Sequence, residues 1–281
     1  TFRLDVGHGR LRRAFEAVVA LGRARRGQKI DRDELLRTIE AELGLSLAAP
    51  GSFALHLVSD RPEPTPADAF TLDFSAYSGV PGRYAPPTDW TRDVGVPLGV
   101  LATWLRDRGR RRVAITGSYR LTTGFLLGAA LRSAAGFELD IDTKSGAWAT
   151  DEHPRAGDAP SLTLRPAAQL SSGVLRLAFG VLRSPEAILV GSGVPGDTVA
   201  TAQCDEAVTS GRAQQALVAA FKRFATAETT RLTPEAVELY FVGPASLAVA
   251  LGHRWNAMPP TQVFEFDGSA NLYSPTGRVE R

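Results

Sequence analysis

Two segments of this 281-residue chain repeat one order of apolar strand, small-residue loop and apolar helix. VAITGSYRLTTGFLLGAALR begins at Val113, and VELYFVGPASLAVALGHRWN begins at Val237. In this alignment Gly128 meets Gly252 within the two helices, where a glycine costs roughly 1 kcal/mol relative to alanine. The shared glycine indicates a tandem duplication, and we expect it to let each helix pack closely on its sheet.

The other elements follow the same offset of 124 residues that separates Gly128 from Gly252. A predicted strand that begins at Phe53 then falls inside a second predicted strand, Val174 to Val181. A predicted helix over 94–108 likewise aligns with another over 211–227. Alternating strands and helices are typical of an α/β architecture with a largely parallel sheet.

The predicted fold is therefore α/β, with two fused α/β units that arose by internal duplication. We expect the first unit over 51–165 and the second over 166–281. We expect residues 1–50 to form a short helical segment with two predicted helices, or a linker to a further domain. The first of these helices is strongly basic, with Arg10, Arg12, Arg13, Arg23, Arg25 and Arg26. This charge is compatible with a nucleic-acid or effector contact, and equally with a solvated helix face.

Composition excludes several classes of protein. Cys204 is the only cysteine, so neither an internal disulfide nor a cysteine-based zinc site is possible. The sequence contains no apolar run of the ~20 residues that a membrane-spanning helix needs. We expect a cytoplasmic protein without a membrane contact. The net charge is +2, and only Lys29, Lys144 and Lys222 are lysines among the basic residues.

No familiar catalytic or phosphate-binding motif is present. The chain lacks a P-loop and an HExxH motif, and its four histidines are scattered. GSGVPG at 191–196 has the glycine spacing of a dinucleotide fingerprint and follows AILV, a possible strand. Pro195 stands where the helix should begin, so a glycine turn is the favoured interpretation. We predict no catalytic residue, no cofactor and no metal.

Two acidic pairs leave one alternative open. Asp140 with Asp142, and Glu265 with Asp267, lie near equivalent predicted strand ends, where Asp142 aligns with Asp267 after one inserted residue. Such pairs are compatible with a carboxylate metal site or with solvated strand ends, and the second interpretation is favoured.

The loops that follow the two repeated strands are the candidate ligand contacts. Gly117 is followed by Ser118, Tyr119 and Arg120, and the second loop is Gly243, Pro244, Ala245 and Ser246. In open α/β sheets ligands bind where strands end and helices begin, and a helix N-terminus favours anions. The predicted contacts of an anionic ligand are therefore the other residues of the two loops, Ser118, Tyr119, Arg120, Gly243, Pro244, Ala245 and Ser246.

Basic and aromatic residues add four further candidates. Lys144 and Trp148 follow the outer strand of the first unit, and Arg254 and Trp255 end the repeated helix of the second. Lysine and arginine can neutralise phosphates, and tryptophan can stack on bases. Two alternatives remain. Trp148 can anchor a loop on the core, and the basic residues at the end of the helix can interact favourably with the helix dipole.

At these residues the sequence resembles the SAVED domain family. The pattern YFVGPASLAVALGHR at 240–254, followed by VFEF at 263–266, resembles the C-terminal signature of that family. The segment from Gly117 to Arg132, with Lys144 and Trp148, resembles the looser signature of its first half. The resemblance extends over about Ser52 to Asn271.

The resemblance implies two fused CARF-like Rossmann units that sense a cyclic oligonucleotide. SAVED domains serve antiphage systems, CBASS and some type III CRISPR systems, and ligand binding often drives their self-association. The implied ligand is a cyclic oligoadenylate, often a trinucleotide, and the implied partner is a fused or separate effector such as a nuclease, a TIR domain or a protease. A ring nuclease that cleaves the same ligand, or another α/β hydrolase, is the rival interpretation.

Overall fold

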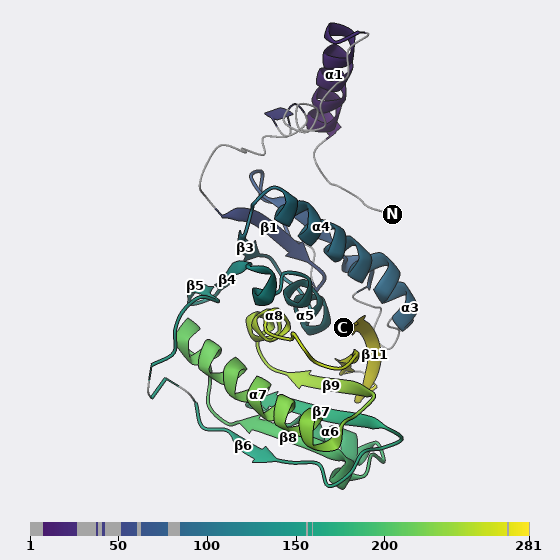
Figure 1. Ribbon diagram of the computed structural model, residues 1–281, viewed down its shortest axis with the longest axis vertical. Helices are drawn as coiled ribbons and strands as arrows, with labels where there is room; N and C mark the ends of the chain where they lie inside the picture. Colours follow the sequence, from purple (N-terminus) through teal and green to yellow (C-terminus); the bar gives the residue numbers. More distant parts are fainter. Residues whose placement is uncertain are drawn as a thin grey trace.

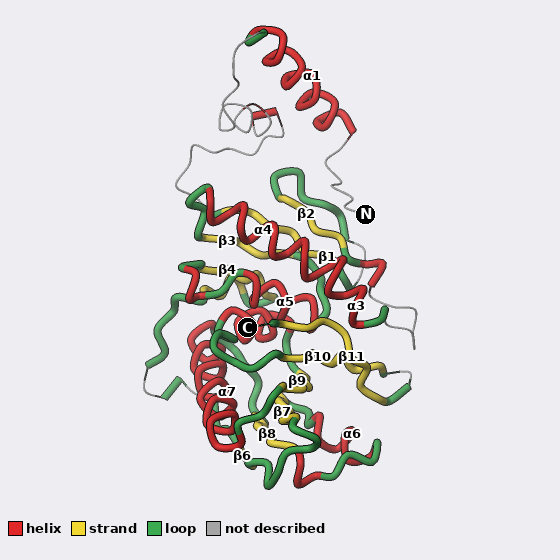
Figure 2. Tube along the Cα trace, turned by 45° about the vertical axis from the view of Figure 1, so that its right-hand side comes forward, coloured by secondary structure: helices red, strands yellow, loops and turns green. Residues whose placement is uncertain are grey.

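The protein is described from a computed structural model, which covers 8–26, 38, 41–42, 52–60, 63–77, 85–155, 157–158, 160–268 and 270–280. The first predicted helix is α1 (His8–Ala24), which lies at one end of the long axis (Figures 1 and 2). The second helix predicted before residue 45 lies largely outside the described residues. No helix in the described part of the chain is both long enough and apolar enough to cross a membrane.

The first sheet has five strands in the order β2-β1-β3-β4-β5. Its strands are β1 (Phe53–Val58), β2 (Phe70–Asp73), β3 (Arg112–Thr116), β4 (Glu138–Thr143) and β5 (Gly146–Ala149). The first four are parallel, and β5 returns antiparallel to β4. Leu55, Leu57 and Ile115 are fully buried. Leu55 and Leu57 share one face of the sheet, because alternate residues of a strand point the same way.

Helices cover that buried face. They are α3 (Pro87–Trp90), a π-helical turn (Thr91–Gly95), α4 (Val96–Asp107) and α5 (Leu121–Ala130), with a short 3-10 turn at Ser133–Ala135 and another at Ser75–Tyr77. Pro97 sits in the first turn of α4, where a missing N–H costs no helical hydrogen bond. Leu98 and Leu105 of α4 pack in the same core cluster as Leu55 and Ile115.

The second sheet has six strands in the order β11-β10-β9-β7-β8-β6. Its strands are β6 (Thr163–Arg165), β7 (Val174–Val181), β8 (Val199–Cys204), β9 (Ala236–Val242), β10 (Thr261–Asp267) and β11 (Leu272–Val279). Strands β7 to β10 are parallel, and β6 and β11 are antiparallel edges. The helices are α6 (Pro185–Gly191), α7 (Gly211–Leu232) and α8 (Ala245–His253), with a 3-10 turn at Gly196–Thr198.

The two sheets share one strand order once β6 is set aside. Reading β2-β1-β3-β4-β5 in the first unit corresponds to β8-β7-β9-β10-β11 in the second. Helix α4 corresponds to α7, and α5 to α8, as the alignment predicted. The α/β fold class of two duplicated Rossmann-like units is thus confirmed.

Strand pairing corrects one detail of the alignment. Val113 pairs with Leu139, whereas its counterpart Val237 pairs with Thr261. The last parallel strand is therefore offset by 122 residues rather than 125. In this register Asp142 corresponds to Phe264 and not to Asp267. The sequence alignment was therefore displaced by three residues at this strand.

The two faces of the second sheet are covered by different helices. Leu177 and Phe179 of β7 share a cluster with α7 and α8, whereas Ala178 lies in a separate cluster with Leu189 of α6. The connection after β7 thus passes over one face and the connection after β9 over the other. The run AILV, read as a possible strand, is part of α6, and Gly193 with a φ of 87° turns the chain after it. GSGVPG is a helix-ending turn and not a fingerprint.

The repeated glycines join the two units to each other. A Cβ on Gly128 would overlap the carbonyl oxygen of Val249, and a Cβ on Gly252 would overlap that of Phe125. Because Phe125 and Val249 are themselves counterparts, the contact is symmetric. Helices α5 and α8 lie side by side between the sheets, seen nearly end-on in Figure 1. The glycines therefore serve helix-on-helix packing, which corrects the predicted packing of helix on sheet.

Candidate functional site

Helices α5 and α8 run in the same direction, so their starts share one side of the molecule. At one end the backbone N–H of Thr122, in the first turn of α5, donates to Glu265 near the end of β10 at 2.9 Å. Near the other end Nδ1 of His253, the last residue of α8, donates to the carbonyl oxygen of Leu131, just after α5. The carboxyl ends of both parallel sheets consequently meet at this junction.

Each unit has a topological switch point at that edge. In the second sheet β7 and β9 are neighbours, and the chain leaves them toward opposite faces through α6 and α8. Such a crevice is the usual ligand site of an open α/β sheet. The corresponding strands in the first sheet are β1 and β3.

The loops at the first switch point are tied together. The N–H groups of Ser59 and Asp60 both donate to the carbonyl oxygen of Ser118, at 2.9 and 3.2 Å. The N–H of Arg120 donates to Oγ of Ser59 at 3.0 Å. Gly117 has a φ of 106°, and a Cβ there would overlap the backbone of Leu57. The loop after β3 is thus fixed by backbone contacts and requires glycine.

The loops at the second switch point are in contact, but no hydrogen bond of the kind found at the first switch point is seen between them in the described residues. A Cβ on Gly243 would lie 3.4 Å from the Cβ of Val181, so the two loops are in contact. Leu182 donates its N–H to the carbonyl oxygen of Cys204 on the other side, at 2.8 Å. Among the described residues, no side chain accepts a hydrogen bond from the N–H groups of Ala245 and Ser246, which we call the α8 start.

The start of α5 is already occupied by a carboxylate. Glu265 is 6% exposed, and its oxygen accepts the N–H of Thr122 from the other unit. Burial raises the pKa of Glu265, and the hydrogen bonds from Thr122 oppose this. Oγ1 of Thr122 also contacts Oγ1 of Thr276 at 2.9 Å. One helix start is therefore filled from within the protein, and its counterpart is open.

The structure brings most of the predicted loop residues to this edge. Ser118 and Arg120 lie at the first switch point, and Gly243, Pro244, Ala245 and Ser246 lie at the second. Tyr119 lies between them but is 8% exposed, with its ring 3.1 Å from where a Cβ on Gly124 would stand. Burial and the charge of Asp142 raise its pKa.

The hairpin of the first unit contains one exposed lysine and one buried tryptophan. Lys144 is exposed in the turn between β4 and β5, at the carboxyl end of β4. Trp148 pairs across the strands with Ile141 and is 8% exposed. Its burial favours the loop-anchor interpretation over a platform for bases.

The predicted residues after α8 lie at the opposite end of that helix. Arg254 is half-buried and joins the units, because it donates to Oε1 of Gln215 and to the carbonyl oxygen of Thr150. Trp255 is 3% exposed, and its Nε1 donates to Oγ1 of Thr261 at 2.9 Å. The structure does not bring these two residues together with the α8 start.

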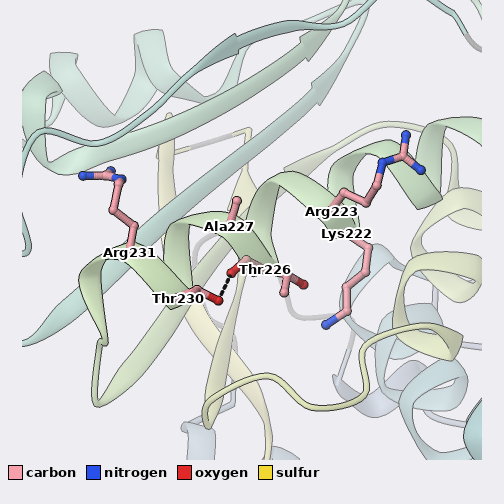
Figure 3. Close-up of a pocket in the computed structure, with 6 residues that line it drawn as sticks. All are labelled: Lys222, Arg223, Thr226, Ala227, Thr230 and Arg231. Carbon is pink, nitrogen blue, oxygen red and sulfur yellow. Dashed lines mark hydrogen bonds between the residues drawn. The ribbon is translucent and has the colours of Figure 1, made fainter.

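An open pocket of about 580 Å³ lies elsewhere, along α7. Its lining residues are Lys222, Arg223, Thr226, Ala227, Thr230 and Arg231 (Figure 3). Lys222 donates to the carbonyl oxygen of Asn256 at 2.7 Å, and burial lowers its pKa to about 8. All six residues belong to one exposed helix face away from the strand ends, so we do not assign the ligand to it.

Sequence reasoning missed the loops after the first strand of each unit. They contain Ser59 and Asp60 after β1, and Leu182 and Arg183 after β7. The strand register gives the signal that was needed, because it pairs Val113 with Phe53 and Val237 with Leu175. An offset of 122 then aligns Asp60-Arg61 with Leu182-Arg183 in the sequence, although Arg61 lies outside the described residues. Among the described residues, no group of three or more His, Cys, Asp or Glu side chains is placed to hold a metal ion.

Several solved structures of similar fold are Cap4 SAVED/CARF-domain containing receptors. The Acinetobacter baumannii Cap4 SAVED/CARF-domain containing receptor with the cyclic trinucleotide 2'3'3'-cAAA matches at 17% identity and a TM-score of 0.69, over 89% of this chain and 56% of that one. The same receptor without a named ligand matches at 17% identity and 0.68, over 100% and 62%. The Moraxella osloensis Cap4 receptor matches at 17% identity and 0.66, over 88% and 54%.

The chain thus spans between 54% and 62% of the length of these receptors. A search of curated proteins finds no match. The model of the "SMODS-associated and fused to various effectors sensor domain" matches residues 99–279, more than half of the chain and most of both units. The chain therefore belongs to the SAVED family.

Proposed function

We propose that this sensor domain binds a cyclic oligonucleotide of the cyclic tri-adenylate type at the joined carboxyl edges of its two units. We place the sensor over 51–281, with the units at 51–165 and 166–281 and with residues 1–50 leading to an effector. Membership of the SAVED family supports a nucleotide ligand, and the Cap4 receptor of similar fold was solved with 3'3'3'-cAAA.

The observation that carries this proposal is the open α8 start beside a second switch point. Free backbone N–H groups at a helix start attract an anion, and a phosphodiester supplies one. Ser118, Arg120 and Lys144 approach the same edge from the first unit and add hydrogen-bonding and charge. A ring with several phosphates offers an anionic group to each unit.

The buried aromatic residues have a supporting role in this proposal. The side chains of three aromatic residues support the loops from the core, because each is less than a tenth exposed: Tyr119, Trp148 and Trp255. Arg254 holds α8 against the first unit and does not contact the ligand. These assignments narrow the contacts predicted from the sequence to the residues at the carboxyl edge.

Ligand binding is proposed to promote self-association that activates an effector. Two similar but unequal units present different faces, so a head-to-tail contact is natural and yields rings or filaments. The ligand shifts this equilibrium only if it binds the assembled state more tightly. Sedimentation velocity with and without ligand measures the shift.

A thermal-shift panel of cyclic di-, tri- and tetranucleotides tests the proposed ligand. A ligand that binds only the folded state stabilises it by about 2.7 kcal/mol at a hundredfold excess over Kd. We expect cyclic tri-adenylate to raise the Tm and linear tri-adenylate to do so weakly. A flat response across the panel, with folded protein confirmed, would contradict the proposal. A time course with labelled ligand separates a sensor, which returns it intact, from a ring nuclease.

A further inference from the structure

The turn after β7 displays an apolar side chain in a conformation that its residue type disfavours. Leu182 has a φ of 62° and is 59% exposed. The other non-glycine residues with positive φ in the described chain are Ser172, Thr233, Ala257 and Asn271, which are small or polar. A bulky residue is a rare choice for the left-handed region and costs stability there.

Neighbouring contacts impose this conformation. The N–H of Leu182 donates to the carbonyl oxygen of Cys204 at 2.8 Å, and the carbonyl oxygen of Arg183 lies where a Cβ on Gly180 would stand. Pro185 begins α6 directly afterwards. The turn is therefore held on both sides, and the side chains of Leu182 and Arg183 are exposed.

Arg183 is the unpaired cation of this turn. Its side chain is exposed, and no carboxylate among the described residues lies within ion-pair distance of it. Two other arginines of the second unit are in ion pairs, Arg176 with Glu238 at 2.9 Å and Arg231 with Glu228 at 2.6 Å. Asp205 and Glu206 follow the neighbouring strand β8.

This turn borders the α8 start. Val181 precedes Leu182 and lies against Gly243, the residue before Pro244 and α8. An apolar surface, a free guanidinium and open backbone N–H groups thus line one switch point. Arginine pairs with phosphate through two parallel hydrogen bonds, and an aliphatic side chain can cover one face of a base.

We propose that Leu182 and Arg183 form a nucleotide subsite in the second unit, with Arg183 on a phosphate and Leu182 beneath the adjoining base. The subsite rests on the proposed function, because it takes one nucleotide of the same cyclic ligand. It explains why a leucine persists in a strained and exposed position, since a smaller or polar residue would lose the apolar contact.

Calorimetric titration of the full chain with 3'3'3' cyclic tri-adenylate tests the subsite. We expect Arg183→Ala to weaken binding at least tenfold. It should also lower the slope of log Kd against log salt by about one, as loss of one phosphate contact does. The matched control is Arg223→Ala, which removes an equally exposed arginine from α7 and should change neither quantity.

The second variant separates apolar contact from charge. Asparagine tolerates the left-handed region, so Leu182→Asn should leave the Tm equal or higher. We expect at least fivefold weaker binding with an unchanged salt slope. Leu164→Asn is its control, because Leu164 is 47% exposed on the edge strand β6.

The outcomes separate the subsite from the function on which it rests. If the unmodified chain binds the ring and both Arg183→Ala and Leu182→Asn bind equally well, the subsite is wrong and the sensor stands. Equal losses for Arg183→Ala and Arg223→Ala, or equal binding of linear tri-adenylate, would reduce Arg183 to a general charge effect and also refute it. No binding by the unmodified chain would refute both proposals.

Discussion

The two units share a strand order but differ at the edge where they meet. In the first unit the loops after β1 and β3 are tied by hydrogen bonds through Ser118, and the start of α5 is filled by Glu265 of the second unit. In the second unit the corresponding loops only touch, and the α8 start is open. A duplicated framework therefore provides one closed and one open edge.

This difference shows where the two copies diverged. The core kept matched contacts, such as the reciprocal approach of Gly128 to Val249 and of Gly252 to Phe125. At the edge, by contrast, a carboxylate fills the start of α5 and no side chain among the described residues fills the α8 start. Disturbing the shared core should affect both units alike, whereas disturbing the edge should affect only one.

Replacing the buried tryptophans should give the largest effect. We expect Trp255→Ala and Trp148→Ala each to destabilise the protein by about 3 to 5 kcal/mol, because each opens a large core cavity. Trp255 contacts aromatic rings of both units, Phe125 and Phe221. Urea unfolding measures both losses. A folded, fully stable Trp148→Ala with weakened ligand binding would restore the base-stacking interpretation.

Substitution of Gly128 or Gly252, the crossing glycines, should give the next largest effect. It tests whether the contact between α5 and α8, here called the seam, is symmetric. Gly128→Ala and Gly252→Ala should each destabilise by about 3 kcal/mol, because the added methyl group meets a backbone carbonyl that cannot move aside. Gly99→Ala in α4 is the control, since open space surrounds that position, and should stabilise by about 0.5 to 1 kcal/mol. A clearly unequal cost at the two crossing glycines would show that the seam is not symmetric.

A pH dependence should arise from His253, whose counterpart in α5 at the offset of 124 residues is Ala129. Burial lowers its pKa to about 4, from an ordinary value near 6.5. Below pH 6.5 the unfolded chain takes up the proton more readily, so stability falls as the pH drops from 6.5 toward 4. We expect a loss of about 3 kcal/mol across this range, measured by thermal unfolding. His253→Gln should flatten this part of the profile, and an unchanged slope would assign it to carboxylates.

The smallest effect is expected for the hairpin turns that end the two units. The first turn carries exposed Lys144, and the described part of the corresponding turn, Gly268, Ala270 and Asn271, carries no base. We expect Lys144→Ala to weaken ligand binding three- to fivefold without a change in Tm, as loss of one exposed phosphate contact would. Asn271→Ala should leave binding unchanged. Equal effects at the two turns would mean that both hairpins contact the ligand.

Local patterns predicted the architecture well. The repeat around Gly128 and Gly252, and the alternation of strands and helices, sufficed for the fold class and for the switch-point loops at Ser118 and Gly243. AILV was ambiguous because a short apolar run fits a strand or a buried helix equally. Reading it as a strand hid the helix α6, which begins at Pro185 directly after the turn at Leu182.

Contacts between distant segments could not be predicted in this way. Glu265 and Thr122 are 143 residues apart, and nothing in either neighbourhood indicates that they meet. The burial of Trp255 likewise depends on distant residues, Phe125 of the first unit and Phe221 of α7. A tryptophan next to an arginine therefore looked like a ligand contact. Sequence alone located the edge but not its asymmetry.

The glycine crossing also bears on how the chain is made. Helix α5 is apolar on nearly every side, and its most extensive contact is with α8, which is synthesised more than a hundred residues later. At about 5 to 20 residues per second, the ribosome needs on the order of ten seconds to deliver that cover. During this interval the nascent first half exposes the apolar surface of α5 that α8 later covers. Chaperone demand, and the aggregation of truncated products, should therefore concentrate on this half of the protein.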